Sequence, residues 1–139
     1  MIAPAISIVL EGNRRTYEPG DTLSAELRVD SMTLVEAKAV EASVCWYTMG
    51  KGEEDLAVHH FLRITPDGAT GIDVRKPHRL RTVLPYSPLS YEGVIVKVRW
   101  CVRVRVFPMR GRELLADAPF QLGRLPPVAP PAEIAEAAP

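Results

Sequence analysis

The sequence predicts an all-β protein, an antiparallel immunoglobulin-like sandwich of about seven strands. The strongest observation is that residues 94–107 alternate between apolar and mostly cationic side chains, the period-two pattern of a half-buried strand. Six further segments show strand character at regular spacing, with glycine- and proline-containing turn signals between them. No segment shows convincing helical periodicity. Together these features favour two packed antiparallel sheets.

The strand predicted over residues 94–107 is the one that the rest of the chain must accommodate. At roughly 3.3 Å per residue it would run about 45 Å, far longer than an ordinary strand. It therefore needs a long neighbour on each side and a second layer over its apolar face. That face is predicted to hold Val94, Val96, Val98, Trp100, Val102, Val104 and Val106.

The other strands are predicted over residues 4–10, 23–29, 38–48, 56–64, 78–84 and 114–122. Within residues 38–48, the side chains at every second position are predicted to face the core, and those between them are predicted to face outward. The inward set is Val40, Ala42, Val44 and Trp46, and the outward set is Glu41, Ser43, Cys45 and Tyr47. Within residues 56–64 one parity holds Leu56, Val58, Leu62 and Ile64, with His60 among them.

The length of 139 residues corresponds to one domain, which we assign to residues 1–123. From residue 124 onward the chain is rich in proline and alanine and contains no aromatic residue. Such a segment cannot bury enough apolar surface to order itself. Residues 124–139 are therefore predicted to be a flexible tail.

The formal net charge is zero, which argues against a general nucleic-acid binder. The charges are nevertheless segregated along the chain. Residues 1–74 hold six Lys or Arg against twelve Asp or Glu, so about −6, whereas residues 75–112 hold ten against one, so about +9. Two interpretations stay open: strands that neutralise each other across the fold, or a basic docking surface for an acidic or phosphorylated partner.

Cys45 and Cys101 are the two cysteines, and no secretory signal precedes them. No apolar run approaches the roughly 20 residues that span a membrane. A cytoplasmic protein with free thiols is therefore expected, and both cysteines fall on the outward parity of their strands.

Nothing in the sequence indicates catalysis, and we expect a protein that is not an enzyme and has no cofactor. His59 and His60 are adjacent in a strand and are predicted to point to opposite faces. Together with His78 they form no zinc-binding spacing, so no metal site is expected. Neither Ser87 nor Ser90 lies in a nucleophile motif.

Three segments resemble the arrestin-like family in order and spacing, over roughly residues 7–122. Residues 45–64, CWYTMGKGEEDLAVHHFLRI, resemble the strand, Y-G-R-E-D-like loop and L-D-V strand of arrestins. Residues 17–21, YEPGD, resemble the family's early turn, and residues 84–104, LPYSPLSYEGVIVKVRWCVRV, its proline-bearing loop and long strand. The resemblance implies an immunoglobulin-like sandwich that acts as a non-catalytic adaptor, as in trafficking arrestins, the arrestin-fold retromer subunit and bacterial sporulation-control proteins.

The resemblance and the charge pattern single out two candidate contact surfaces. The first resembles the arrestin finger loop, and its glycines would allow it to reshape on binding; it comprises Gly50, Lys51, Gly52, Glu53, Glu54 and Asp55. In the alternative interpretation, this segment is an ordinary hairpin turn whose acidic side chains keep the protein soluble. The second surface is the basic stripe of Lys97, Arg99, Arg103 and Arg105.

The neutralisation of that stripe depends on the strand register. If residues 38–48 and 94–107 pair with Cys45 opposite Cys101, Glu41 falls opposite Arg105 and Tyr47 opposite Arg99. In the same register Arg103 faces Ser43 and Lys97 faces Met49. Such cross-strand pairs contribute roughly 0.2–1 kcal/mol each, and part of the stripe stays unneutralised by this neighbour.

Three classes of function remain open. The first hypothesis is a protein-interaction or scaffold module that uses the finger-like loop and the basic face. The second is a self-assembling structural domain, because a single sandwich exposes edge strands. The third is binding of an anionic ligand through the same arginines.

Overall fold

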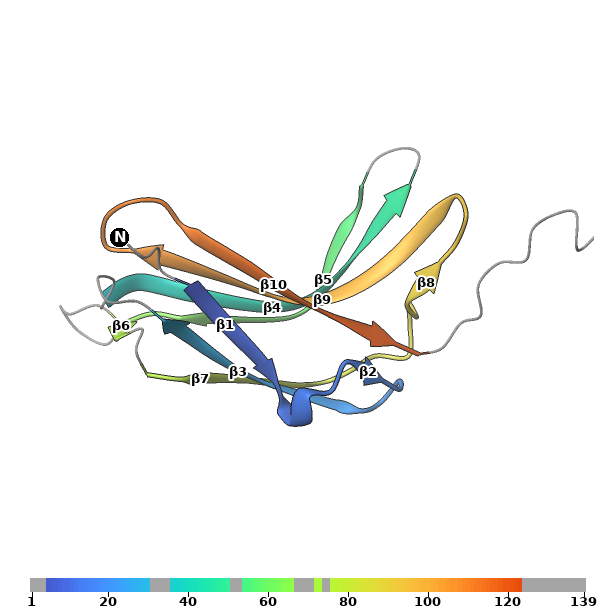
Figure 1. Ribbon diagram of the computed structural model, residues 1–139, viewed down its shortest axis with the longest axis horizontal. Helices are drawn as coiled ribbons and strands as arrows, with labels where there is room; N and C mark the ends of the chain where they lie inside the picture. Colours follow the sequence, from blue (N-terminus) through green and yellow to red (C-terminus); the bar gives the residue numbers. More distant parts are fainter. Residues whose placement is uncertain (1–4, 31–35, 51–53, 67–71, 74–75, 124–139) are drawn as a thin grey trace, which may run out of the picture.

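The computed structural model describes residues 5–30, 36–50, 54–66, 72–73 and 76–123, which form two packed β-sheets (Figure 1). The seven predicted strands are all present in it. They are β1 (Ala5–Leu10), β3 (Thr22–Asp30), β4 (Glu36–Gly50), β5 (Leu56–Ile64), β7 (His78–Val83), β9 (Val96–Pro108) and β10 (Leu114–Leu122). A 3-10 turn, η1 (Glu11–Asn13), follows β1. The predicted tail, residues 124–139, lies outside the described residues.

The smaller sheet has the strand order β1-β3-β7, and the larger sheet has the order β2-β10-β9-β4-β5. Three short strands were not predicted, because two residues are too few to show an alternating pattern. They are β2 (Thr16–Tyr17), β6 (Ile72–Asp73), which pairs with β4, and β8 (Tyr91–Glu92), which pairs with β9. The described strands pair antiparallel, except that β2 runs parallel to β10. The predicted antiparallel β-sandwich is confirmed.

The pairing of β4 with β9 has the register that the sequence offered only as a condition. Cys45 lies opposite Cys101, and Trp46 lies opposite Trp100. Two long strands with the same period can align their apolar faces only in steps of two residues, which restricts the register strongly. The remaining predicted pairs are also present: Glu41 with Arg105, Ser43 with Arg103, Tyr47 with Arg99 and Met49 with Lys97.

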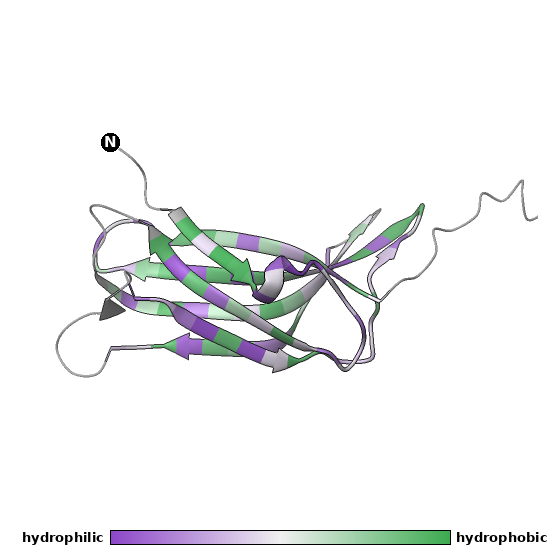
Figure 2. Cartoon of the chain, turned by 60° about the horizontal axis from the view of Figure 1, so that its bottom comes forward, coloured by the Kyte–Doolittle hydropathy of each residue, from purple (hydrophilic) through white to green (hydrophobic). Residues whose placement is uncertain are grey.

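The core lies between the two sheets and is made of the inward parity of each strand. Figure 2 shows the resulting alternation of hydrophobic and hydrophilic residues along the strands. Burying a valine or leucine side chain contributes roughly 1.5–3 kcal/mol, so the shared layer dominates the stability. Its most completely buried side chains include Leu23 and Leu27 of β3, Leu80 of β7, Val44 of β4 and Trp100, Val102 and Val104 of β9.

The inward face of β9 is buried over a shorter length than predicted. The strand begins at Val96, not Val94, and the two side chains are 41% and 80% exposed. Figure 1 shows the reason: this end of β9 projects beyond the smaller sheet, so no second layer covers it. The prediction that Val94 and Val96 belong to the core is therefore wrong.

The predicted single apolar face of β5 is interrupted by a β-bulge. Opposite Val44 and Cys45 the register shifts, so that His59 is an extra residue in β5. Leu62 and Ile64 pack against the core as predicted. Leu56 and Val58 instead lie on the outer face of the sheet.

The same bulge corrects the prediction that His59 and His60 point to opposite faces. His60 lies opposite the buried Val44, which places it on the inner face. The His59 ring lies 6.1 Å from the ring of Trp100, and its Nε2 lies 2.8 Å from the carbonyl oxygen of Val83 in β7. Both histidines therefore face the smaller sheet, and His59 links β5 to β7.

Candidate functional site

One end of the larger sheet projects beyond the smaller sheet and forms what we call the arm, residues 46–50, 54–58 and 91–98 (Figure 1). The end of β4 and the start of β5 form one hairpin of the arm. The short strand β8 and the start of β9 form the other. The two hairpins are held together by pairing of β4 with β9 as far as Gly50 opposite Val96.

The tip of the arm is apolar and exposed. Val94 and Ile95, in the turn between β8 and β9, have exposed fractions of 80% and 74%. Two adjacent large aliphatic side chains in a solvent-exposed turn are unusual, because turns favour small polar residues. Figure 2 shows this hydrophobic stretch at the free end of the arm.

The predicted finger-like loop lies beside this tip. Its glycine Gly50 packs against the other hairpin so closely that a Cβ there would lie 2.2 Å from the carbonyl oxygen of Ile95, so only glycine fits. At the base of the loop, the backbone N–H of Thr48 donates to the carbonyl of Asp55 at 2.9 Å, and the Asp55 N–H donates to the Thr48 hydroxyl at 3.0 Å. Glu54 is exposed. Lys51, Gly52 and Glu53 lie outside the described residues.

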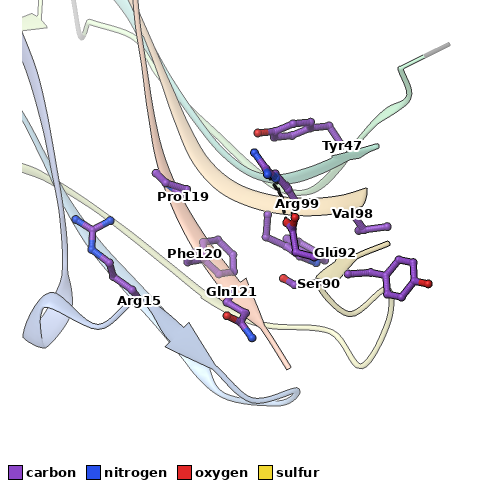
Figure 3. Close-up of a pocket in the computed structure, with 11 residues that line it drawn as sticks. Arg15, Tyr47, Ser90, Glu92, Val98, Arg99, Pro119, Phe120 and Gln121 are labelled. Carbon is purple, nitrogen blue, oxygen red and sulfur yellow. Dashed lines mark hydrogen bonds and ion pairs between the residues drawn. The ribbon is translucent and has the colours of Figure 1, made fainter. Parts of the chain in front are cut away.

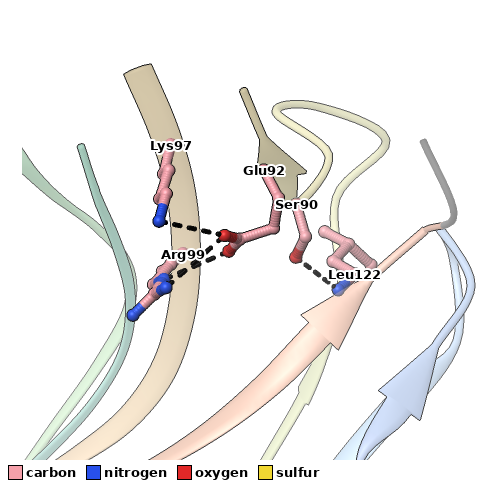
Figure 4. Close-up of polar contacts among 5 residues, drawn as sticks. All are labelled: Ser90, Glu92, Lys97, Arg99 and Leu122. Atoms are coloured by element: carbon pink, nitrogen blue, oxygen red, sulfur yellow. Dashed lines mark hydrogen bonds and ion pairs between the residues drawn. The ribbon is translucent and has the colours of Figure 1, made fainter. Parts of the chain in front are cut away.

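The structure places the four residues of the basic stripe along the outer face of β9, where acids of the same chain partly neutralise them. Arg99 donates from Nε and Nη2 to the two carboxylate oxygens of Glu92, at 3.1 and 3.4 Å, and Lys97 Nζ lies 3.7 Å from the same carboxylate (Figure 4). Arg103 makes a bidentate contact to Asp117 of β10 at 2.8 and 3.1 Å. These acids lie on the other side of β9 from β4.

The ion pairs shift the pKa values of Glu92, Arg99 and Arg103 in the expected directions. The hydrogen bonds from Arg99 hold the pKa of the Glu92 carboxyl below its ordinary value. The hydrogen bonds to Asp117 raise the pKa of Arg103. Exposed pairs of this kind contribute about 0–1 kcal/mol, so a partner's carboxylates could displace them at little loss.

Arg105 differs from the other three cations of the stripe. It lies opposite Glu41 of β4, but Glu41 is bonded to Arg63 of β5. Within the described part of the chain Arg105 has no ion pair. Together with Arg103 it lines a shallow groove of about 170 Å³ on the outer face of β4, β5 and β9.

A larger pocket, of about 440 Å³, opens at the base of the arm (Figure 3). β10 pairs with β9 as far as Phe120 opposite Trp100. Closer to the start of β9, the neighbouring strand is β8, and the pocket lies at this change of neighbour. Its polar groups include Arg15, Arg99 and Glu92. Sequence reasoning missed this pocket because its walls come from distant segments. The one available signal was Glu92, the single acid in a strongly basic stretch.

The loop below the pocket is fixed by hydrogen bonds that the sequence did not predict. Ser90 pairs with Leu122 of β10: its backbone N–H donates to the Leu122 carbonyl, and its hydroxyl accepts from the Leu122 N–H, both at 2.7 Å (Figure 4). The indole N–H of Trp100 donates to the carbonyl of Pro88 at 2.8 Å. These bonds connect the core to the wall of the pocket.

Cys45 and Cys101 are free and buried, with their sulfur atoms 3.6 Å apart. They lie on the outer side of the sheet, as their parity predicts, but neighbouring side chains cover them. The hydrogen bond between the thiols lowers the pKa of Cys45, whereas that bond and burial raise the pKa of Cys101. In the described residues no three His, Cys, Asp or Glu side chains cluster as metal ligands would.

We expect Arg99→Met to raise the pKa of the Glu92 carboxyl toward its ordinary value, because the guanidinium is the principal group that lowers it. Carboxyl-detected NMR titration would measure this shift. In the wild type, the Glu92 pair stabilises the fold above the unfolded-state pKa, and this contribution is lost as the pH falls through the lowered pKa. Arg110→Met is the control, and an unchanged Glu92 titration in Arg99→Met would contradict the pairing.

Among the comparisons with known proteins, the search of solved structures found a protein of similar fold. A scan against protein-family models and a search of curated proteins gave no match. The crystal structure of Spo0M, a sporulation control protein from Bacillus subtilis, matches with a TM-score of 0.63 and 16% identity. The match covers 90% of this chain and 51% of Spo0M, so the chain spans about half the length of that protein.

The likeness at this identity concerns the fold alone. In the described part of the chain, no helix has the length and apolar character needed to cross a membrane. Strand order, register and the match to Spo0M agree on the architecture. The chain has an arrestin-type β-sandwich fold.

Proposed function

We propose that this chain is a non-catalytic protein-interaction module of the arrestin-like type, which binds a protein partner through the arm and the adjoining basic face in the cytoplasm. The observation that carries the proposal is the exposed apolar tip of the arm, Val94 and Ile95, beside the finger-like loop. Adjacent exposed apolar side chains of this kind are a common mark of a contact site.

The charges beside the tip indicate the chemistry of the partner. Lys97 and Arg99 lie directly behind the tip on β9, and their shared carboxylate, Glu92, is exposed. Acidic side chains of a partner could replace Glu92 while its apolar side chains cover the tip. Apolar contact would then supply affinity, and charge would supply orientation and association rate.

The fold supports a regulatory role by analogy only. Spo0M is described as a sporulation control protein. A shared fold does not by itself carry a function from one protein to another. The arrestin resemblance implies the loop of residues 50–55 as a contact surface, and the charge pattern of the sequence adds the basic face. The basic face is taken to comprise Lys97, Arg99, Arg103 and Arg105.

The test compares an arm variant with a surface variant of the same kind. Val94→Asp/Ile95→Asp removes the apolar tip, and Val9→Asp places one of these charges on an exposed apolar position of β1, in the smaller sheet. Proteins retained from native cytosol by the wild type would be identified by mass spectrometry, purified and titrated against all three chains. We expect at least a tenfold loss of affinity for the arm variant and no change for Val9→Asp.

Equal binding of the purified partner by the arm variant would overturn the assignment of the site. The alternative, an anionic ligand bound by the arginines, gives a different result. It predicts binding to anionic lipid vesicles or nucleic acid with a steep dependence on salt, and little effect of the arm variant. That outcome would replace the proposed protein partner.

A further inference from the structure

We propose that two copies of this chain associate through β5, edge to edge and antiparallel, so that the two larger sheets form one continuous sheet. This inference is independent of partner binding at the arm tip. It rests on the edge protection of the other strands, on the exposed side chains of β5 and on the symmetry of their spacing.

The side of the sandwich formed by β1 and β10 is closed. Ile8 and Leu10 of β1 line a small hollow together with Ala118 of β10, so the two edges lie against each other. In addition, β2 pairs with the end of β10, and Pro119 in β10 lacks a backbone N–H. These two edges are therefore partly covered within the described residues.

On the opposite side, the edges of the two sheets are β7 and β5. The exposed residues of β7 include Arg79 and Arg81, and two such strands from two copies would repel each other. In β5 the single charged residue, Arg63, stands near the end of the strand. Within the described residues no further strand pairs with the outer edge of β5. This edge is therefore the least protected one that the structure describes.

The outer face of β5 is apolar and exposed. Leu56 and Val58 are 54% exposed, and Phe61 is 53% exposed. Because the N–H and C=O of Asp55 point to β4, those of Leu56 and Val58 point away from β4, toward the free edge. A nine-residue edge with three large apolar side chains and one charge has the features of a strand that pairs with another chain.

The bulge makes this strand self-complementary. Because His59 is an extra residue, the outer-face positions are Leu56 and Val58 on one side of the bulge and Phe61 and Arg63 on the other. A two-fold axis between residues 59 and 60 would place Val58 opposite Phe61 of the second copy, and Leu56 opposite Arg63 of the second copy. Apolar side chains then meet across the interface, and the stems of the two arginines cover the leucines.

The choice of a second copy as the occupant follows from this symmetry and from charge. An isologous interface requires one surface to complement itself about a two-fold axis, which the spacing on β5 satisfies. The net charge of zero gives two copies no overall repulsion. The two bulges would face each other at the axis and so leave the flanking pairs in register.

The experiment measures the association of the full-length chain by sedimentation velocity and light scattering over a wide concentration range. The wild type is expected to dimerise as concentration rises. Val58→Lys/Phe61→Lys is expected to raise the dissociation constant at least tenfold, because four lysines would meet at the axis. Leu115→Lys, at an equally exposed apolar position on β10, is the matched control and is expected to dimerise as the wild type does.

Amide hydrogen exchange on the unmodified chain gives a second test that does not depend on the variant's folding. Raising the concentration should slow exchange at Leu56 and Val58, but not in β7. A strict monomer at the highest concentration would overturn the proposal. The proposal would also be overturned if the folded double-lysine variant dimerised as the wild type does. It would equally be overturned if dimerisation slowed amide exchange in other strands and not in β5.

Discussion

Val44→Asp is expected to remove a large part of the stability of the fold. The Val44 side chain is fully buried in the central strand β4, opposite Val102 in the core. A carboxylate there has no cationic partner, and burying it or protonating it removes on the order of 4 kcal/mol or more of stability. Domains of this size have about 5–15 kcal/mol in total, so the loss is a large part of it. Urea unfolding followed by circular dichroism would measure the change.

Ser43→Asp is the matched control, because it introduces the same charge one residue earlier on the same strand. Ser43 faces outward and lies opposite Arg103. Its replacement is expected to change the free energy of unfolding by less than about 1 kcal/mol. If Ser43→Asp were as damaging as Val44→Asp, the assignment of the two faces of β4 would be wrong.

Trp100→Ala is expected to lower the free energy of unfolding by about 4 kcal/mol, within the usual range for deleting a buried aromatic side chain. The Trp100 side chain is 1% exposed, and its ring lies 5.9 Å from that of Phe120 and 6.1 Å from that of His59. Its removal leaves a cavity between β9, β10 and β5. The Pro88 carbonyl also loses its donor. Urea unfolding by circular dichroism is again the measurement.

Trp100→Phe separates the two contributions, because it retains an aromatic ring and removes the indole N–H. We expect it to lose less stability than Trp100→Ala. Val94→Ala is the exposed control and is expected to stay within about 0.5 kcal/mol of the wild type. A loss below about 1 kcal/mol for Trp100→Ala would show that this ring is not central to the core.

The position of the candidate site was only partly predictable. The finger-like loop and the basic stripe could be located from sequence, and the β4–β9 register placed Arg99 and Arg103 correctly. Their neutralising acids were missed, because the register with β4 concerns only one side of β9. Asp117 approaches Arg103 from β10, and Glu92 reaches Arg99 from β8. The assignment of residues 50–55 and of the basic stripe as contact surfaces stays a prediction.

The bulge in β5 illustrates a second limit. Alternation along residues 56–64 indicates one face only if every residue advances the pattern by one step. One extra residue, His59, reverses the faces of everything before it, so Leu56 and Val58 leave the face that Leu62 and Ile64 keep. A bulge depends on the fit of β5 to its neighbour, and the local sequence does not show it.

The sequence by itself determined the sandwich and its seven main strands, because the period-two pattern is a property of each strand. The structure then selected the register with Cys45 opposite Cys101, which the sequence offered only as a condition. Only the tertiary structure decided how far the second layer extends. Where the smaller sheet ends, the same valine pattern that is buried at Val102 becomes the exposed tip at Val94. A pattern of side chains specifies a face, but burial requires another surface to cover it, and here that surface comes from strands distant in the sequence.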